Sequence, residues 1–81
     1  MKTHGAALRV IREMAEVSIK QLASQAKVDQ GLLSRVETGK KPGLSDATVG
    51  RVAQVLSDAA PVPVSRERMV EAITYPEVQP S

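Results

Sequence analysis

The sequence of 81 residues contains no cysteine, no tryptophan and no phenylalanine, and it has a single tyrosine. Without cysteine, neither disulfide bonds nor zinc–thiolate sites can stabilise a chain so near the lower size limit for one hydrophobic core. No apolar run is long enough to span a bilayer, and residues 1–10 lack the apolar stretch of a secretory signal. These absences predict one small, soluble, cytoplasmic protein without a membrane partner, for which dimerisation would add stability.

Groups of residues that could perform catalysis are missing as well. His4 is the only histidine, and it lies in a segment that looks unstructured. It has no neighbours with which to form a Ser–His–Asp arrangement or a metal site. We therefore expect no enzymatic activity, no metal and no cofactor.

Charge is distributed unevenly along the chain. The formal net charge is +2, but residues 1–41 hold eight basic and four acidic side chains, whereas residues 42–81 hold three basic and five acidic ones. The first half is therefore at +4 and the second at −2. An asymmetry of this sign indicates that the first half faces a polyanion, while the second half has a different role.

Two short amphipathic helices are predicted within residues 18–41. Ser18 and Asp29 precede them as N-caps, since their side-chain oxygens can accept from free backbone N–H groups. Only residues 27–29 separate the helices, so they must meet at a steep angle, and Gly39 can end the second in a left-handed conformation. The apolar positions at helical spacing are Ile19, Leu22, Ala23 and Ala26 in the first helix, and Leu32, Leu33 and Val36 in the second.

Further helices are predicted on both sides of this pair. Residues 6–16 and 47–56 each place apolar side chains on one face, and Ser45 is a plausible N-cap for the second of these segments. Prolines in residues 59–64 indicate a linker, because they cannot continue a helix. Ser65 then begins a fifth helix over residues 66–74, and residues 76–81 form a frayed tail. The expected organisation is a domain at 1–58, a linker at 59–64 and a C-terminal segment at 65–81.

A series of residues at fixed spacing connects the first helix to the basic loop after the third. These residues are Leu8-Arg9, Ile11-Arg12, Ser18, Leu22-Ala23, Val28, Leu33-Ser34-Arg35-Val36-Glu37, Gly39-Lys40 and Pro42. The series resembles the Cro and phage-repressor (Xre-like) helix-turn-helix family from Leu8 to about residue 56, with no gap as far as Pro42. The resemblance implies an all-α fold, a lambda-repressor-like compact bundle of four to five short helices containing a helix-turn-helix.

In this motif the second helix enters the major groove of double-stranded DNA with its N-terminal half. The expected base contacts are Gln30, Gly31, Leu32, Ser34 and Arg35. The resemblance places Gln30 where the family often has a base-reading Gln, and Arg can read guanine. Arg35 could equally contact a phosphate. Leu32 could be core, but we favour contact with a thymine methyl, since Leu33 and Val36 already serve the core.

Phosphate contacts are expected on both sides of the base-reading helix, from Lys20, Gln21, Lys40 and Lys41. The chain departs from the family pattern at three places. Ile19 stands where Gln commonly touches a phosphate, Lys27 replaces a frequent turn Gly at a small cost in strain, and Gly31 replaces a polar or small hydroxyl residue.

The resemblance also implies an ion pair between Arg12 and Glu37, which would join the first and third helices. Since the positions pair across helices, this couple is expected to support the fold and not to contact DNA.

The function that fits these observations is a sequence-specific transcriptional regulator, expected to be a repressor that binds a palindromic operator as a homodimer. The segment 62–75 could form the dimer contact or could pack on the core as an ordinary fifth helix. Two alternatives remain: an antitoxin-like module whose C-terminal segment binds a protein partner, and an architectural or recombination factor that bends DNA.

Overall fold

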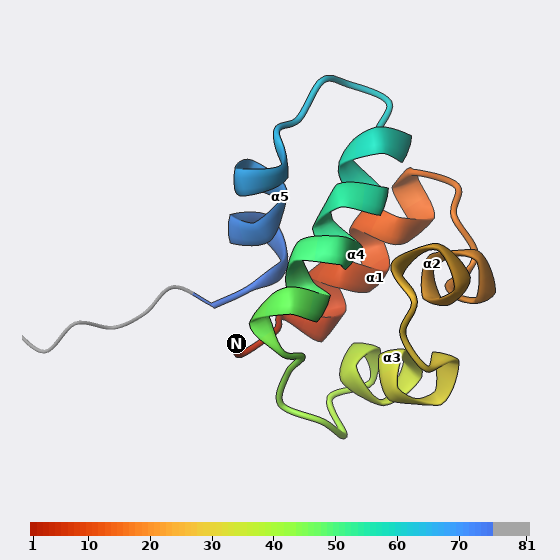
Figure 1. Ribbon diagram of the computed structural model, residues 1–81, viewed down its shortest axis with the longest axis vertical. Coiled ribbons are helices and arrows are strands. Elements are labelled where there is room, and N and C mark those ends of the chain that lie inside the picture. The colour runs from red at the N-terminus through yellow and green to blue at the C-terminus, as the bar shows by residue number, and fades with distance from the viewer. Residues whose placement is uncertain (76–81) are drawn as a thin grey trace, which may run out of the picture.

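The computed structural model describes residues 1–75, and within them the fold is all-helical, as expected from the sequence. The helices are α1 (Gly5–Met14), α2 (Ile19–Ala26), α3 (Gln30–Glu37), α4 (Asp46–Ala59) and α5 (Arg66–Ile73). Figure 1 shows α4 between α5 on one side and α2 on the other. None of these helices is of a length and apolarity that would let it traverse a bilayer. Residues 76–81, the expected frayed tail, lie outside the described part of the chain.

A side chain caps the N-terminus of every helix. Ser18, Asp29, Ser45 and Ser65 accept from backbone N–H groups in the first turn of α2, α3, α4 and α5, as predicted. His4 corrects the sequence analysis, because it is not part of an unstructured segment. Its Nδ1 accepts from the backbone N–H of Ala7 at 3.1 Å and caps α1.

One hydrophobic core joins all the helices. α5 packs against α4 and α1, and its Met69 and Ile73 are 3% and 0% exposed. Of the two arrangements open for the C-terminal segment, the helix therefore packs on the core through this face. α4 runs to Ala59, the first residue of the expected linker. The other buried apolar residues are Leu8, Leu22, Ala23, Ala26, Leu33, Val36, Leu44, Val49, Val52, Ala53 and Leu56.

Residues 1–4 form an N-terminal arm that was not anticipated. The arm lies between the loop after α3 and the end of α5, with bridges from Lys2 to Gly43 and from Thr3 to Thr74. Thr3 is 5% exposed, and its Oγ1 accepts from the backbone N–H of Leu44 at 3.2 Å. The arm thus joins segments that are distant in sequence. It also fixes the loop after α3, which contains Lys40 and Lys41.

Candidate nucleic-acid interface

The turn between α2 and α3 has the tight geometry predicted from its three residues. Lys27 has a left-handed backbone with φ 56°, which a glycine would adopt at lower cost. The N–H of Val28 donates to the carbonyl of Ala23 at 2.9 Å, and the Val28 side chain packs against the core. The α2–α3 pair is therefore a helix-turn-helix held from inside by the buried residues of both helices.

The outer face of α3 is polar and open. Gln30, Gly31, Ser34 and Arg35 are exposed, whereas Leu33 and Val36 on the inner face are buried. The helix begins at Asp29, whose Oδ2 accepts from the N–H of Leu32 at 2.9 Å. α3 can therefore meet a ligand along this side without disturbing the core.

Gly31 makes room for its neighbours on this face. A Cβ at Gly31 would lie 3.1 Å from Oδ2 of Asp29 and 3.4 Å from Nη1 of Arg35. The Arg35 guanidinium thus lies back along the helix toward its N-terminal turn, over the glycine. Since a helix enters the major groove with its N-terminal half, this orientation brings Arg35 toward the region where bases would be read.

Leu32 is placed differently from the other expected base contacts. It is half-buried and packs against the hydrophobic core, so the inner face of α3 is wider than Leu33 and Val36 alone. The sequence favoured a thymine contact because Leu33 and Val36 already contribute to the core, but Leu32 contributes to it as well, so this reason does not hold. A contact with a thymine methyl through its outer part stays a prediction.

The four expected phosphate-binding side chains are exposed at both ends of the α2–α3 unit. Oε1 of Gln21 accepts from the N–H of Ser18 at 2.9 Å, which leaves the amide NH₂ as its donor. The N–H groups of Lys40 and Lys41 donate to the carbonyl of Arg35 at 2.8 and 3.1 Å. Gly39 precedes them with φ 81°, the predicted left-handed conformation. Both lysines are therefore fixed at the backbone beside the end of α3.

Arg12 and Glu37 form an ion pair between α1 and α3. Nε and Nη2 of Arg12 donate to the two carboxylate oxygens of Glu37 at 2.8 and 3.0 Å, and Nη1 donates to the carbonyl of Val17 at 3.0 Å. The hydrogen bonds with Glu37 raise the pKa of Arg12 above its ordinary value, against the opposing effect of burial. The Glu37 side chain is only 4% exposed, so the pair holds two helices together inside the molecule.

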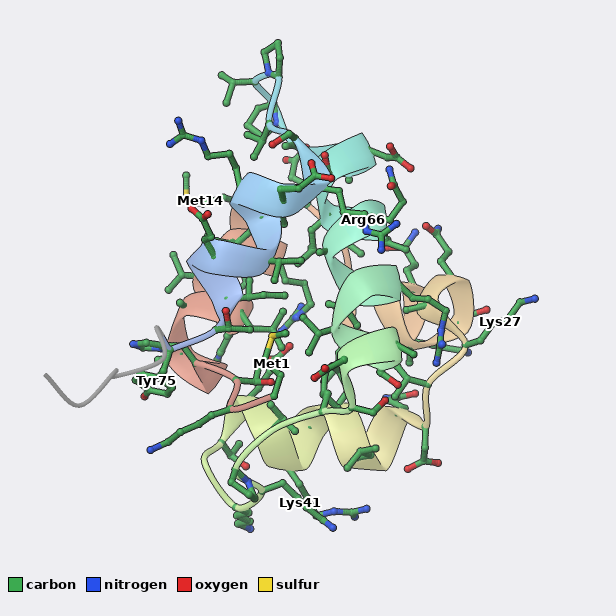
Figure 2. The ribbon with its side chains drawn as sticks, turned by 60° about the vertical axis from the view of Figure 1, so that its left-hand side comes forward. Met1, Met14, Lys27, Lys41, Arg66 and Tyr75 are labelled. Carbon is green, nitrogen blue, oxygen red and sulfur yellow. The ribbon has the colours of Figure 1, made fainter. Side chains whose placement is uncertain are left out.

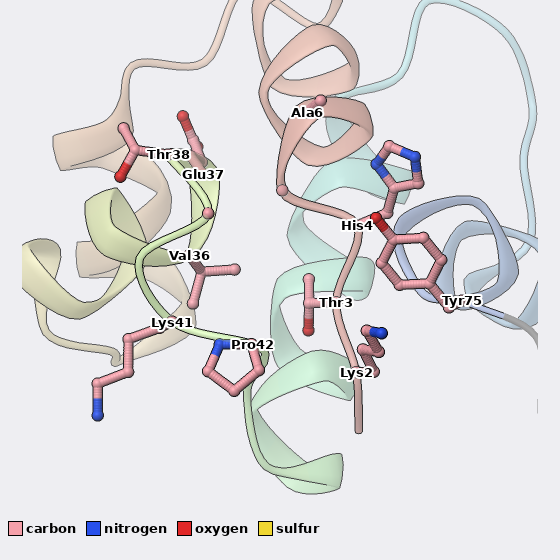
Figure 3. A pocket seen from close by; sticks show the side chains of 12 residues that line it. Lys2, Thr3, His4, Ala6, Val36, Glu37, Thr38, Lys41, Pro42 and Tyr75 are labelled. Carbon is pink, nitrogen blue, oxygen red and sulfur yellow. The ribbon is translucent and has the colours of Figure 1, made fainter.

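A hollow beside the loop contains residues that the sequence analysis missed. Lys2 and His4 of the arm line one side, and Lys41 and Pro42 line the other (Figure 3). The ring of Tyr75 stacks on His4 with centroids 4.8 Å apart. Gly43 permits the close approach of the arm, because a Cβ there would collide with the carbonyl oxygen of Met1.

The described residues 1–75 contain no group of three His, Cys, Asp or Glu side chains placed to hold a metal ion. The chemistry of the α2–α3 surface is instead that of neutral and cationic hydrogen-bond donors. Such a surface suits a polyanion that also presents base edges.

Comparisons with known proteins agree with this geometry. The family described as a helix-turn-helix domain matches residues 5–57. The chain is also similar to the HTH-type transcriptional repressor RghR of Bacillus subtilis (strain 168), with 34% identity over 56 residues. That match covers 69% of this chain and 42% of RghR, so the chain spans about two fifths of the relative's length. No solved structure matches the chain. The family match covers α1 to α4 and includes the whole α2–α3 unit, and the chain belongs to the helix-turn-helix domain family.

Proposed function

We propose that this protein binds double-stranded DNA in a sequence-specific manner and represses transcription. The observation that carries the proposal is the division of α3 into a buried inner face and an open outer face with Gln30, Ser34 and Arg35. These side chains can donate to and accept from base edges in the major groove. The repressor role is supported by the name of the relative RghR.

The basic side chains on either side of α3 have a different task in this proposal. Lys20 and Gln21 lie in the first turn of α2, and Lys40 and Lys41 lie in the loop after α3. They hold phosphates and orient α3, whereas Gln30 and Arg35 distinguish bases. Affinity for any DNA therefore depends on the first group, and preference for an operator depends on the second.

A second surface, away from α3, supports the proposal that the protein binds a palindromic operator as a homodimer. An apolar groove lies between α1, the linker and α5, and Ile11, Met14 and Val64 are among its lining residues. Met14 is 66% exposed and Val62, at the linker side of the groove, is 60% exposed. Figure 2 shows Met14 far from Lys41, so the groove and the DNA-facing loop do not compete for space.

The charges around the groove favour a second copy of the chain as its occupant. Arg9 and Glu13 of α1 pair at 3.3 Å and are well exposed, and Arg68 and Glu71 of α5 are exposed too. A helix surface that carries both signs can pair with its own copy under a two-fold axis, which is the usual symmetry of dimers. A palindromic operator of this kind has half-sites about 34 Å apart, which is the separation that the two copies of α3 would have to match.

Selection of bound sequences from a random duplex library at physiological salt tests this function. We expect enrichment of an inverted repeat, which would give the half-site of a dimeric repressor. The variant Gln30→Ala/Arg35→Ala is the control, because it retains Lys20, Gln21, Lys40 and Lys41 and should enrich sequences much more weakly. Enrichment of one unrepeated site would rule out the palindrome, and no enrichment with the unaltered protein would overturn sequence-specific binding.

A further inference from the structure

The hollow between the N-terminal arm and the loop after α3 has a cation on each side. Lys2 lies in the arm and Lys41 lies in the loop, and both are exposed (Figure 3). We propose that this hollow is a binding site for a backbone phosphate of DNA, with Lys2 as a contact in addition to those in the helix-turn-helix. The inference rests on the proposed function and extends the surface that the DNA backbone would follow.

Among the described residues 1–75, Glu37 is the one acidic side chain that lines the hollow, and it is neutralised within the protein. Both carboxylate oxygens of Glu37 accept from the Arg12 guanidinium, and the Glu37 side chain is 4% exposed. Glu37 would therefore repel a phosphate bound between Lys2 and Lys41 only weakly.

Lys2 is held in place and does not belong to a free end. The N–H of Tyr75 donates to the carbonyl of Lys2 at 3.1 Å, and Lys2 is bridged to Gly43 on its other side. Its Nζ lies 5.0 Å from the centroid of the Tyr75 ring, in a cation–π contact. Because the residue is already ordered, less conformational entropy is lost when it binds a phosphate.

Hydrogen bonds of the next residue, Thr3, fix Lys2 relative to the loop. The N–H of Thr3 donates to the carbonyl of Pro42 at 3.0 Å, and Thr3 Oγ1 accepts from the N–H of Leu44. Lys41 directly precedes Pro42, so the two lysines are mounted on one hydrogen-bonded frame. That frame adjoins the C-terminal end of α3, where a DNA strand leaving the base-reading surface would run.

The test measures the salt dependence of binding to the selected operator and to random DNA for the full chain. Lys2→Met keeps the aliphatic stem and removes the charge. One lost phosphate contact should weaken both kinds of binding by about three- to tenfold and reduce the slope of log K against log salt by about 0.9. Lys2→Arg should restore the slope.

Two further variants separate charge from structure. Arg66→Met removes an exposed cation at the start of α5, at the other end of that helix from Tyr75, and should leave the slope unchanged. Tyr75→Leu removes the ring that Lys2 covers but keeps the ammonium group, and it should also retain the slope. If Tyr75→Leu and Lys2→Met lost the same amount, loosening of the arm would explain the loss and the contact would be ruled out.

The remaining outcomes distinguish the site from the function. If the unaltered protein bound DNA and Lys2→Met kept its slope, the phosphate site would be wrong while the proposed function stood. If the unaltered protein bound no DNA, both would fail. A site for free phosphate would appear as thermal stabilisation by inorganic phosphate that Lys2→Met loses without any change in DNA binding, and it would overturn the assignment to DNA.

Discussion

The outer face of α3 and the face formed by α1, the linker and α5 meet solvent in opposite ways. The first presents Gln30, Ser34 and Arg35 over a buried apolar side, whereas the second leaves Met14 and Val62 largely exposed. A polar face that is fully hydrated needs a partner with hydrogen-bonding groups, and an apolar face gains by being covered. Under the proposed function, the first face binds DNA and the second binds another copy of the chain.

The largest effect is expected where the two surfaces are connected, at the Arg12–Glu37 pair between α1 and α3. Glu37→Ala leaves a mostly buried guanidinium without its partner and should lower the free energy of unfolding by about 3 kcal/mol. Thermal and urea unfolding would measure this loss. Glu13→Ala, which removes the exposed pair with Arg9 and a lesser charge effect on Arg12, should cost less than about 0.5 kcal/mol. Equal melting of Glu37→Ala and the unaltered protein would show that the pair contributes no stability.

The next effect concerns only the polar face. Arg35→Ala should cost about 1–3 kcal/mol in binding to the selected operator and little on random DNA, because a base contact is specific. Lys40→Ala is the matched contrast, since loss of a phosphate contact should weaken both by the same factor. Titrations with both DNAs would separate the roles. Parallel losses for both variants would place Arg35 among the phosphate contacts, the other role considered for it.

The apolar face can be altered independently of α3. Met14→Glu introduces a charge into the groove and should raise the dimer dissociation constant by about tenfold or more, since an apolar side chain can no longer be buried there. Sedimentation equilibrium would measure the change, with Met14→Leu as a control that should dimerise normally. If Met14→Glu dimerised like the unaltered protein, the dimer contact would lie on another surface.

A smaller effect is expected from filling the space above Gly31. Gly31→Ala should gain helix propensity worth up to about 1 kcal/mol, reduced by crowding against the Asp29 carboxylate. The new methyl group should also move the Arg35 guanidinium and change the base preferred at its position. Urea unfolding and a second library selection would report the two effects. A more stable variant with unchanged preference would mean that Arg35 does not use this space.

The helix starts could be predicted because they depend on local chemistry. Ser18 and Asp29 mark the starts of α2 and α3, because their side-chain oxygens accept from N–H groups three residues later, a signal contained within one turn. The Arg12–Glu37 pairing came from the family resemblance and not from spacing, since the residues are 25 positions apart.

The arm could not be predicted for the opposite reason. His4 caps α1 through a contact only three residues away, but histidine is not among the preferred N-cap residues. Its stacking on Tyr75 arises only because residues 1–4 lie between two distant segments. The partial burial of Leu32 could not be predicted for a similar reason. α3 has only eight residues, and its neighbours cover more of its surface than Leu33 and Val36 alone. The spacing of apolar residues in the sequence does not show how wide this covered face is.

The capping box at the start of α2 has a consequence for the chemical ageing of the protein. The Gln21 carboxamide supplies its oxygen to the Ser18 N–H and presents its nitrogen outward. Deamidation to glutamate would exchange that nitrogen for a second oxygen, and the helix would keep an equally good or better cap. In the proposed complex with DNA, the same exchange would replace a hydrogen-bond donor that faces a phosphate with a negative charge. The deamidated protein would thus stay folded with its free energy of unfolding preserved, but the DNA that it is proposed to bind would repel it.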